Sequence, residues 1–201
     1  MNKFGIACDC HNTLINSNEA WVHAFVDYAG REYESTITFW LYGKMKRREL
    51  AKRLNIDFEL IENRANLYEK PNVEVISLLM MAKQMGIPLF VVSNAPSRRV
   101  LRDMEITGIF DLFTKVYTGD DGGKKNLSIF DNILNEFNLD YLLFLGNEEF
   151  DDHIEHEKVV SFALTSFLKK RHSIINGETV DSNGVVLFSN ESKEHKNEKD
   201  S

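Results

Sequence analysis

A chain of 201 residues is long enough for one domain or for a core with a small insertion, because domains commonly contain ~100–200 residues. The hydrophobic fraction of 43% and the charged fraction of 27% are close to globular averages, which excludes a fibrous or wholly disordered chain. The net charge of −7 argues against a general nucleic-acid-binding surface. No apolar run approaches the ~20 residues of a membrane span, and the first apolar stretch is too short for a signal peptide, so we expect a cytoplasmic protein.

Short apolar runs that end at polar or small residues indicate buried strands. The predicted strands are residues 4–9, 87–92, 141–145 and 159–164, with a weaker candidate at 115–117. Helical patterns lie between them, at residues 73–85 and 128–137. This alternation predicts an α/β fold with a parallel sheet covered by helices on both faces and ligands bound beyond the carboxyl ends of the strands.

Residues 17–70 interrupt this alternation, because they contain three helical patterns and no strand of comparable strength. The predicted helices are residues 18–28, 44–54 and 57–68. We therefore predict a small helical cap at residues 17–70, inserted after the first strand of a core formed by residues 1–16 and 71–188. Residues 189–201 have no aliphatic or aromatic side chain and mix both charges, which predicts a disordered tail.

Side chains with complementary chemistry follow four of the predicted strands. Asp9 ends the first strand, Ser93 follows the second, Lys124 or Lys125 follows a glycine-containing loop, and several acids follow Gly146. An aspartate at a strand end is more often a turn residue, so Asp9 alone is weak evidence. A nucleophilic carboxylate, a phosphate-binding hydroxyl, a cation and metal-binding acids at one sheet edge together suit phosphoryl transfer.

These four sites, in this order, resemble the four motifs of the haloacid dehalogenase (HAD) superfamily. The first motif, DxDxT, aligns with residues 9–13, so the resemblance implies Asp9 as nucleophile and Thr13 as the motif's hydroxyl. His11 stands where the second aspartate is usual. The second motif, an apolar strand ending in Ser or Thr, matches Ser93, with Asn94 next to it.

The third and fourth motifs are matched with departures from the usual residues. Residues 124–130 have the spacing of the lysine motif KPxPxxF without its prolines, which favours Lys124 over Lys125. Residues 146–151 keep the frame of GDxxxD, with Asn147 in place of the first aspartate and Asp151 as the second. The resemblance covers residues 4 to about 164 and implies a HAD-like Rossmannoid three-layer sandwich.

The resemblance implies a two-step phosphatase reaction on a small phosphorylated metabolite, for which a nucleotide is one candidate. Asp9 would attack phosphorus and water would then hydrolyse the aspartyl phosphate. Ser93 and Lys124 would bind the phosphoryl oxygens, with Thr13 and Asn94 beside them. Mg²⁺ would be held by Asp9, by the backbone carbonyl of His11, and by Asn147 and Asp151, because this cation prefers oxygen ligands.

The departures at His11 and Asn147 leave three interpretations open. An imidazole can replace the usual acid/base aspartate near neutral pH, because its unperturbed pKa is about 6.5. Asn147 keeps a coordinating oxygen but loses a charge, so a catalytically impaired HAD-fold binding or scaffold protein is the first alternative. A metal-independent dehalogenase is the second, because those enzymes also lack the second aspartate.

Two further features of the sequence are informative. The basic segment at residues 44–53, with six Lys or Arg residues, is either a solvated helix face or a funnel for an anionic substrate. Cys8 and Cys10 are separated by one residue, a spacing that disfavours a disulfide, and they lack the partners of a zinc site. We expect both cysteines to be small buried residues.

Overall fold

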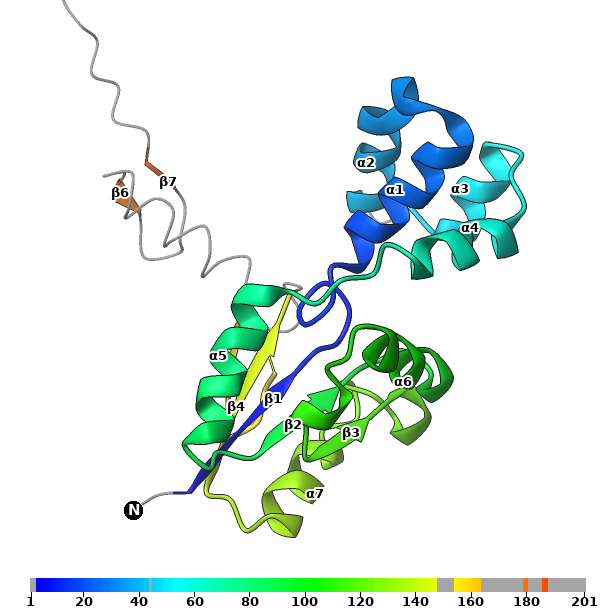
Figure 1. Ribbon diagram of the computed structural model, residues 1–201. Coiled ribbons are helices and arrows are strands. Elements are labelled where there is room, and N and C mark those ends of the chain that lie inside the picture. The colour runs from blue at the N-terminus through cyan, green and yellow to red at the C-terminus, as the bar shows by residue number, and fades with distance from the viewer. Residues whose placement is uncertain (1–2, 44, 148–153, 164–178, 181–185, 188–201) are drawn as a thin grey trace, which may run out of the picture.

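The computed structural model describes residues 3–43, 45–147, 154–163, 179–180 and 186–187, and contains a five-stranded parallel sheet (Figure 1). Its strands are β1 (Phe4–Cys8), β2 (Leu89–Val92), β3 (Lys115–Tyr117), β4 (Tyr141–Gly146) and β5 (Val159–Ala163). They lie in the order β3-β2-β1-β4-β5, and each neighbouring pair is parallel. All five predicted strands are present, which confirms the predicted α/β class with a parallel sheet.

Helices cover both faces of the sheet and form a three-layer arrangement (Figure 1). The helices that follow the first strand are α1 (Ser17–Ala29), η1 (Arg31–Tyr33), α2 (Glu34–Tyr42), α3 (Arg47–Arg53), α4 (Phe58–Asn66), α5 (Val73–Gln84), α6 (Ser97–Ile106), η2 (Phe110–Leu112), η3 (Gly119–Asp121) and α7 (Ser128–Glu136). Alternate residues of β1 point to opposite faces. Ile6 and Cys8 pack with α5 and α6, whereas Ala7 packs on the side of α7.

Helices α1 to α4 have a hydrophobic cluster of their own, separate from the two clusters of the sheet. Trp21, Phe25, Ile37, Leu50 and Ile61 are buried in it. In Figure 1 this segment projects from the carboxyl edge of the sheet. An independent core of this kind supports our proposal that residues 17–70 act as a cap, whose exact bounds stay a prediction.

Two short linkers, residues 13–16 and 67–72, join the helical segment to the sheet. They run beside each other and are hydrogen-bonded to each other. The backbone N–H of Asn16 donates to the carbonyl of Lys70 at 3.0 Å, and that of Asn72 donates to the carbonyl of Leu14 at 2.7 Å. Asn12, at a φ of 61°, makes the tight turn between β1 and the first linker. This turn holds His11 and Thr13 at the base of the linkers.

Two helices were not predicted from the sequence, α2 and α6. The α2 segment contains Thr36, Ile37, Thr38 and aromatic residues, which favour strands, so it lacks a clear helical signal. The α6 segment is rich in charge, with Arg98, Arg99 and Arg102.

The short strands β6 (Thr179–Val180) and β7 (Val186–Leu187) pair antiparallel, and the predicted tail at 189–201 lies outside the described residues.

Candidate active site

A buried ion pair lies at the carboxyl edge of the sheet. Asp9 directly follows β1, and its backbone N–H donates to the carbonyl of Leu145 on β4 at 2.8 Å. The Nζ atom of Lys124 lies 3.3 Å from Asp9 Oδ2, and both side chains are under 10% exposed. Lys125, by contrast, is exposed. The structure therefore brings Lys124 to the candidate nucleophile.

Asn94 fixes the loop that carries Lys124. Its Oδ1 accepts a hydrogen bond of 2.8 Å from the backbone N–H of Lys124. Gly123, at a φ of 62°, packs so closely that a Cβ there would lie 2.5 Å from Asn94 Oδ1. Only glycine fits this approach at such a φ. Asn94, predicted to bind substrate, thus positions the loop through its side-chain oxygen.

The two predicted hydroxyl residues lie buried beside these groups. Ser93 directly follows β2, is 2% exposed, and its Oγ accepts a hydrogen bond from the backbone N–H of Ala95 at 3.2 Å. Thr13 is fully buried, and its Oγ1 has no hydrogen-bond partner within the part of the chain that the structure describes. A buried hydroxyl without a partner is costly, so Thr13 has hydrogen-bonding capacity to offer a ligand.

His11 has a partner that the sequence did not reveal. Its Nε2 lies 2.9 Å from Oδ2 of Asp103 on α6, and the Asp103 side chain is fully buried. Arg102 holds the other oxygen of Asp103, with Nη2 at 2.7 Å. A carboxylate accepts hydrogen bonds, so the Nε2–H of His11 donates to Asp103 and leaves Nδ1 able to accept a proton.

The electrostatics of this pair follow from burial and hydrogen bonding. Burial lowers the pKa of His11, and the nearby charges of Arg99 and Arg47 lower it further, against the opposing effect of Asp103. Burial would raise the pKa of Asp103, but hydrogen bonds from His11 and Arg102 hold it below its usual value. Asp103 therefore stays ionised and His11 is neutral at pH 7 in the absence of a ligand.

Oxygen donors suited to a hard cation gather at the same edge. Asp9 comes directly after Cys8 and Asn147 comes two residues after Leu145, and Cys8 and Leu145 are paired on neighbouring strands. Asn147 Oδ1 is buried, and the carbonyl of His11 lies two residues beyond Asp9. Among the described residues, no group of three His, Cys, Asp or Glu side chains could hold a metal ion. Asp151, the remaining predicted ligand, lies outside the described residues.

The two cysteines are free and buried. Burial raises the pKa of both thiols, and the charge of Asp9 raises it further. Thiols with a raised pKa are poor nucleophiles and poor metal ligands, because the thiolate is the reactive form. Their packing in the sheet core agrees with the expected structural role.

The basic segment is mainly a solvated face, with one exception. Arg48 and Arg53 are exposed and lie over the rings of Phe58 and Trp40. Arg47 instead is half-buried, lies over the ring of Trp21, and donates from Nη2 to Asn18 Oδ1 at 3.3 Å. Among the basic residues of this segment that the structure describes, Arg47 alone is partly buried.

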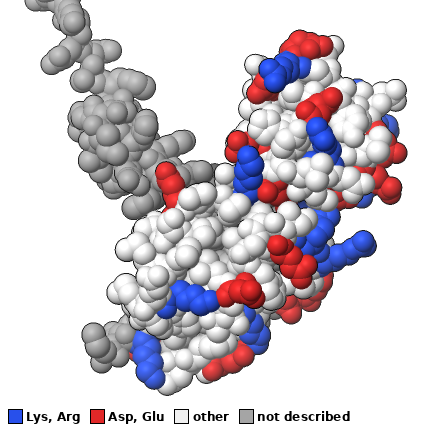
Figure 2. Space-filling view, viewed as in Figure 1, with Lys and Arg blue, Asp and Glu red and all other residues white. Residues whose placement is uncertain are grey.

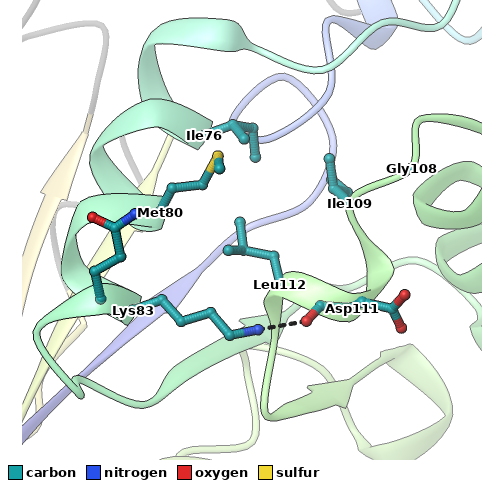
Figure 3. Close-up of a pocket in the computed structure, with 8 residues that line it drawn as sticks. Ile76, Met80, Lys83, Gly108, Ile109, Asp111 and Leu112 are labelled. Carbon is teal, nitrogen blue, oxygen red and sulfur yellow. Dashed lines mark hydrogen bonds between the residues drawn. The ribbon is translucent and has the colours of Figure 1, made fainter.

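A pocket of about 390 Å³ lies between α5 and η2 (Figure 3). Ile76, Met80, Ile109 and Leu112 line it, and the Lys83 ammonium donates to the carbonyl of Asp111 at its rim (Figure 3). It contains none of the predicted site residues.

No described helix is long and apolar enough to cross a membrane.

The sheet, with a buried carboxylate and a buried lysine at its carboxyl edge, defines an α/β protein with a site suited to nucleophilic catalysis. The model of the haloacid dehalogenase-like hydrolase family matches residues 5–151. The chain therefore belongs to this family, and the predicted HAD membership and fold are confirmed. No curated protein matches the sequence.

Solved structures show the same fold. A hydrolase from Streptococcus pneumoniae TIGR4 aligns with a TM-score of 0.63 at 20% identity, over 87% of this chain and 100% of that one. A candidate β-phosphoglucomutase from Thermotoga maritima aligns with a TM-score of 0.55 at 18% identity, over 78% and 83%. An L-2-haloacid dehalogenase aligns with a TM-score of 0.56 at 18% identity, over 77% and 82%. At these identities the similarity establishes the fold alone.

Proposed function

We propose that this HAD-like hydrolase is a phosphatase that acts on a small phosphorylated metabolite, with Asp9 as the nucleophile. The observation that carries the proposal is the buried contact between Asp9 Oδ2 and Lys124 Nζ at 3.3 Å. The ammonium of Lys124 lies against the Asp9 carboxylate in a buried position, and the same ammonium can neutralise a phosphoryl oxygen.

In the first step, a carboxylate oxygen of Asp9 attacks phosphorus and the bond from phosphorus to the ester oxygen breaks. His11 gives a proton to that leaving oxygen, so the product is a neutral alcohol. A bound phosphate dianion favours the imidazolium form, which counteracts the lowered pKa of the free enzyme. Ser93 and Lys124 hold the phosphoryl oxygens throughout.

In the second step, neutral His11 takes a proton from water, which attacks the phosphorus of the aspartyl phosphate. The bond from phosphorus to the Asp9 oxygen breaks, inorganic phosphate leaves, and His11 is again protonated. Asp103 accepts the hydrogen bond from His11 Nε2–H, so Nδ1 is the nitrogen that exchanges the proton. His11 thus stands in place of the second aspartate of the usual motif, and the Asp103 carboxylate orients it.

Mg²⁺ fits the oxygen donors at this edge. Asp9, the carbonyl of His11 and Asn147 would hold it, together with Asp151. When bound, the cation neutralises negative charge on the phosphoryl oxygens. We propose that the amide at Asn147 makes this binding weaker than a carboxylate would, because one formal charge is missing.

The test is phosphate release from a panel of nucleoside monophosphates and sugar phosphates, with Mg²⁺ and with a chelator. Wild type is compared with Asp9→Asn and with the control Asp111→Asn, which changes an exposed aspartate. We expect Mg²⁺-dependent release that Asp9→Asn abolishes and Asp111→Asn retains. Release that persists in Asp9→Asn would refute the assignment of the nucleophile.

The same panel separates the two alternatives. Absence of release, with binding of phosphate esters retained, would indicate the impaired binding or scaffold protein. Halide release from 2-haloacids without metal would indicate a dehalogenase, the activity named for one protein of the same fold. The contact between Asp103 and His11 favours a catalytic protein over a binding protein, because a site that only binds a ligand does not need an oriented imidazole.

A further inference from the structure

The carboxyl group of Glu69, on the second linker, is buried without a hydrogen-bond donor for one of its oxygens. Glu69 is 7% exposed, and its backbone N–H donates to the carbonyl of Ala65 in the last turn of α4 at 3.1 Å. Its Oε2 is buried and has no hydrogen-bond partner among the residues that the structure describes. An ionised oxygen is costly to bury without a donor, so these surroundings disfavour the charged form of Glu69.

The side chain of Glu69 lies within hydrogen-bonding reach of Asp103, so two carboxyl groups meet in a buried place. Asp103 accepts from His11 Nε2 at 2.9 Å and from Arg102 Nη2 at 2.7 Å. Arg99 Nε lies 3.5 Å from the same carboxylate. Donors therefore stabilise negative charge on Asp103, whereas Oε2 of Glu69 has none. Of the two groups, Glu69 is the one that keeps a proton, and its O–H can donate to Asp103.

The positive charge near Glu69 is shared with other carboxylates. Glu59 and Glu62 line a cleft between α4 and α6 together with arginines of α6. Acidic and basic side chains are interspersed where the helical segment meets the sheet (Figure 2). Shared arginines do not hold Glu69 ionised, and burial together with the charge of Asp103 raises its pKa to about 7. The charged and titratable groups that face Glu69 are Asp103, Arg99 and Arg102 from α6, Arg47 from α3, and Cys10 from the turn after β1.

A proton on Glu69 connects the second linker to the imidazole of His11 through Asp103. The main chain beside Glu69 is fixed, because the carbonyl of Lys70 accepts from the backbone N–H of Asn16 at 3.0 Å. A hydrogen bond from this anchored position limits the rotation of the Asp103 carboxylate, which accepts from His11. If Glu69 lost its proton, two carboxylates would repel each other and the orientation of Asp103 would loosen.

We propose that Glu69 is a positioning residue, whose protonated carboxyl group donates a hydrogen bond to Asp103 and thereby helps to orient His11. This inference rests on the proposed function for the role of His11 as acid/base. Glu69 does not touch the substrate and acts through Asp103 alone. The position requires a neutral hydrogen-bond donor, so an amide can replace the carboxylic acid and an alkyl side chain cannot.

Carbon NMR of protein with isotope-labelled glutamate carboxyl carbons tests the proton without turnover. We expect one carboxyl signal to titrate with a midpoint of about 7, and this signal should be absent from Glu69→Gln. Exposed glutamates should titrate at about 4.3, and the control Glu105→Gln should remove one of these signals instead. A Glu69 signal that titrates with the exposed glutamates would overturn the proposal.

Values of kcat/KM at pH 6, where Glu69 is protonated, test the positioning role. Glu69→Gln keeps a donor toward Asp103 and should stay within about 3-fold of wild type. Glu69→Leu removes the donor and should lose about 10-fold for esters of ordinary alcohols. The loss should be much smaller for p-nitrophenyl phosphate, because its leaving group needs no proton from His11. A merely structural role would lower kcat/KM equally for both substrates.

Equal losses in Glu69→Gln and Glu69→Leu, or no loss in Glu69→Leu, would refute the positioning role. Circular dichroism verifies that the variants are folded, and the NMR titration keeps the test valid if Glu69→Leu is unstable. The two experiments also separate this inference from the proposed function. A carboxyl signal with a midpoint of about 7 without phosphate release supports the proton on Glu69 and contradicts the phosphatase. Phosphate release with Glu69 titrating like an exposed glutamate does the reverse.

Discussion

His11 Nε2 lies 2.9 Å from Asp103 Oδ2, and this contact joins the tight turn after β1 to helix α6 across 92 positions of the chain. The carboxylate is fully buried and is held in turn by Arg102 and Arg99. The histidine that replaces a usual aspartate is thus supported by a network of its own. Oriented imidazoles of this kind serve acid/base catalysis.

Replacing Asp103 by asparagine should lower kcat/KM about 10–100-fold for esters of ordinary alcohols, because His11 loses the carboxylate that accepts its Nε2–H and orients its ring. The loss in kcat/KM should be much smaller for p-nitrophenyl phosphate, because kcat/KM reports the phosphorylation step and this leaving group needs no proton. Steady-state kinetics with both substrates measure the difference. Equal losses for both would indicate that Asp103 acts only on stability.

The double variant His11→Gln, Asp103→Asn extends this test. Residues that act as one unit show non-additive losses, so the double variant should be about as slow as His11→Gln alone. Multiplied losses would mean that Asp103 acts independently of His11. Melting temperatures of all three variants control for changes in folding.

Lys124→Met should reduce kcat/KM about 100-fold or more, because it removes the cation beside Asp9 and the phosphoryl oxygens. It also leaves a buried carboxylate without its ion pair, so a lower melting temperature is expected as well. Lys125→Met is the natural control, since Lys125 is exposed and adjacent in sequence. Comparable losses in the two variants would contradict the assignment of Lys124.

The buried carboxyl of Glu69 predicts a pH dependence of stability. Its pKa rises on folding from 4.5 to about 7, so its contribution is complete below about pH 4.5 and is lost as the pH rises through about 7. Wild type should therefore lose about 2–3 kcal/mol more stability than Glu69→Gln between pH 5 and pH 8. Chemical denaturation at both pH values measures this, with the exposed Glu105→Gln as control. Parallel pH profiles of wild type and Glu69→Gln would show that Glu69 titrates normally.

Cys8 and Cys10 should resist thiol reagents in the folded protein. Burial raises both pKa values, so little thiolate forms at pH 8. Ellman's reagent should react with neither cysteine in the native state and with both in guanidinium. Rapid reaction of the native protein would contradict the buried packing of the two residues.

The sheet could be predicted from the sequence because its strands are short apolar runs bounded by polar or small residues. Asp9 and Ser93 follow two of these strands, so their common edge was predictable from the parallel order. The choice between Lys124 and Lys125 needed the structure, because burial distinguishes them and spacing does so weakly.

Asp103 could not be predicted, because it lies in a charged helix that resembles a solvated surface element. Its contact with His11 depends on the fold of the intervening residues, which no local pattern encodes. Arg47 was visible only as one of six basic residues in residues 44–53, and its burial distinguishes it from the exposed Arg48 and Arg53. A buried charge is a tertiary property, so composition alone does not reveal it.

In the proposed mechanism, Asp9 becomes covalently phosphorylated during turnover. Intact-protein mass spectrometry after acid quenching of the reaction, with the best substrate of the panel, measures this most directly. We predict that wild type gains the mass of one phosphoryl group, located at Asp9 by peptide analysis, and that Asp9→Asn gains none. Turnover without any phosphorylated protein, or a phosphoryl group that persists in Asp9→Asn, would contradict the account.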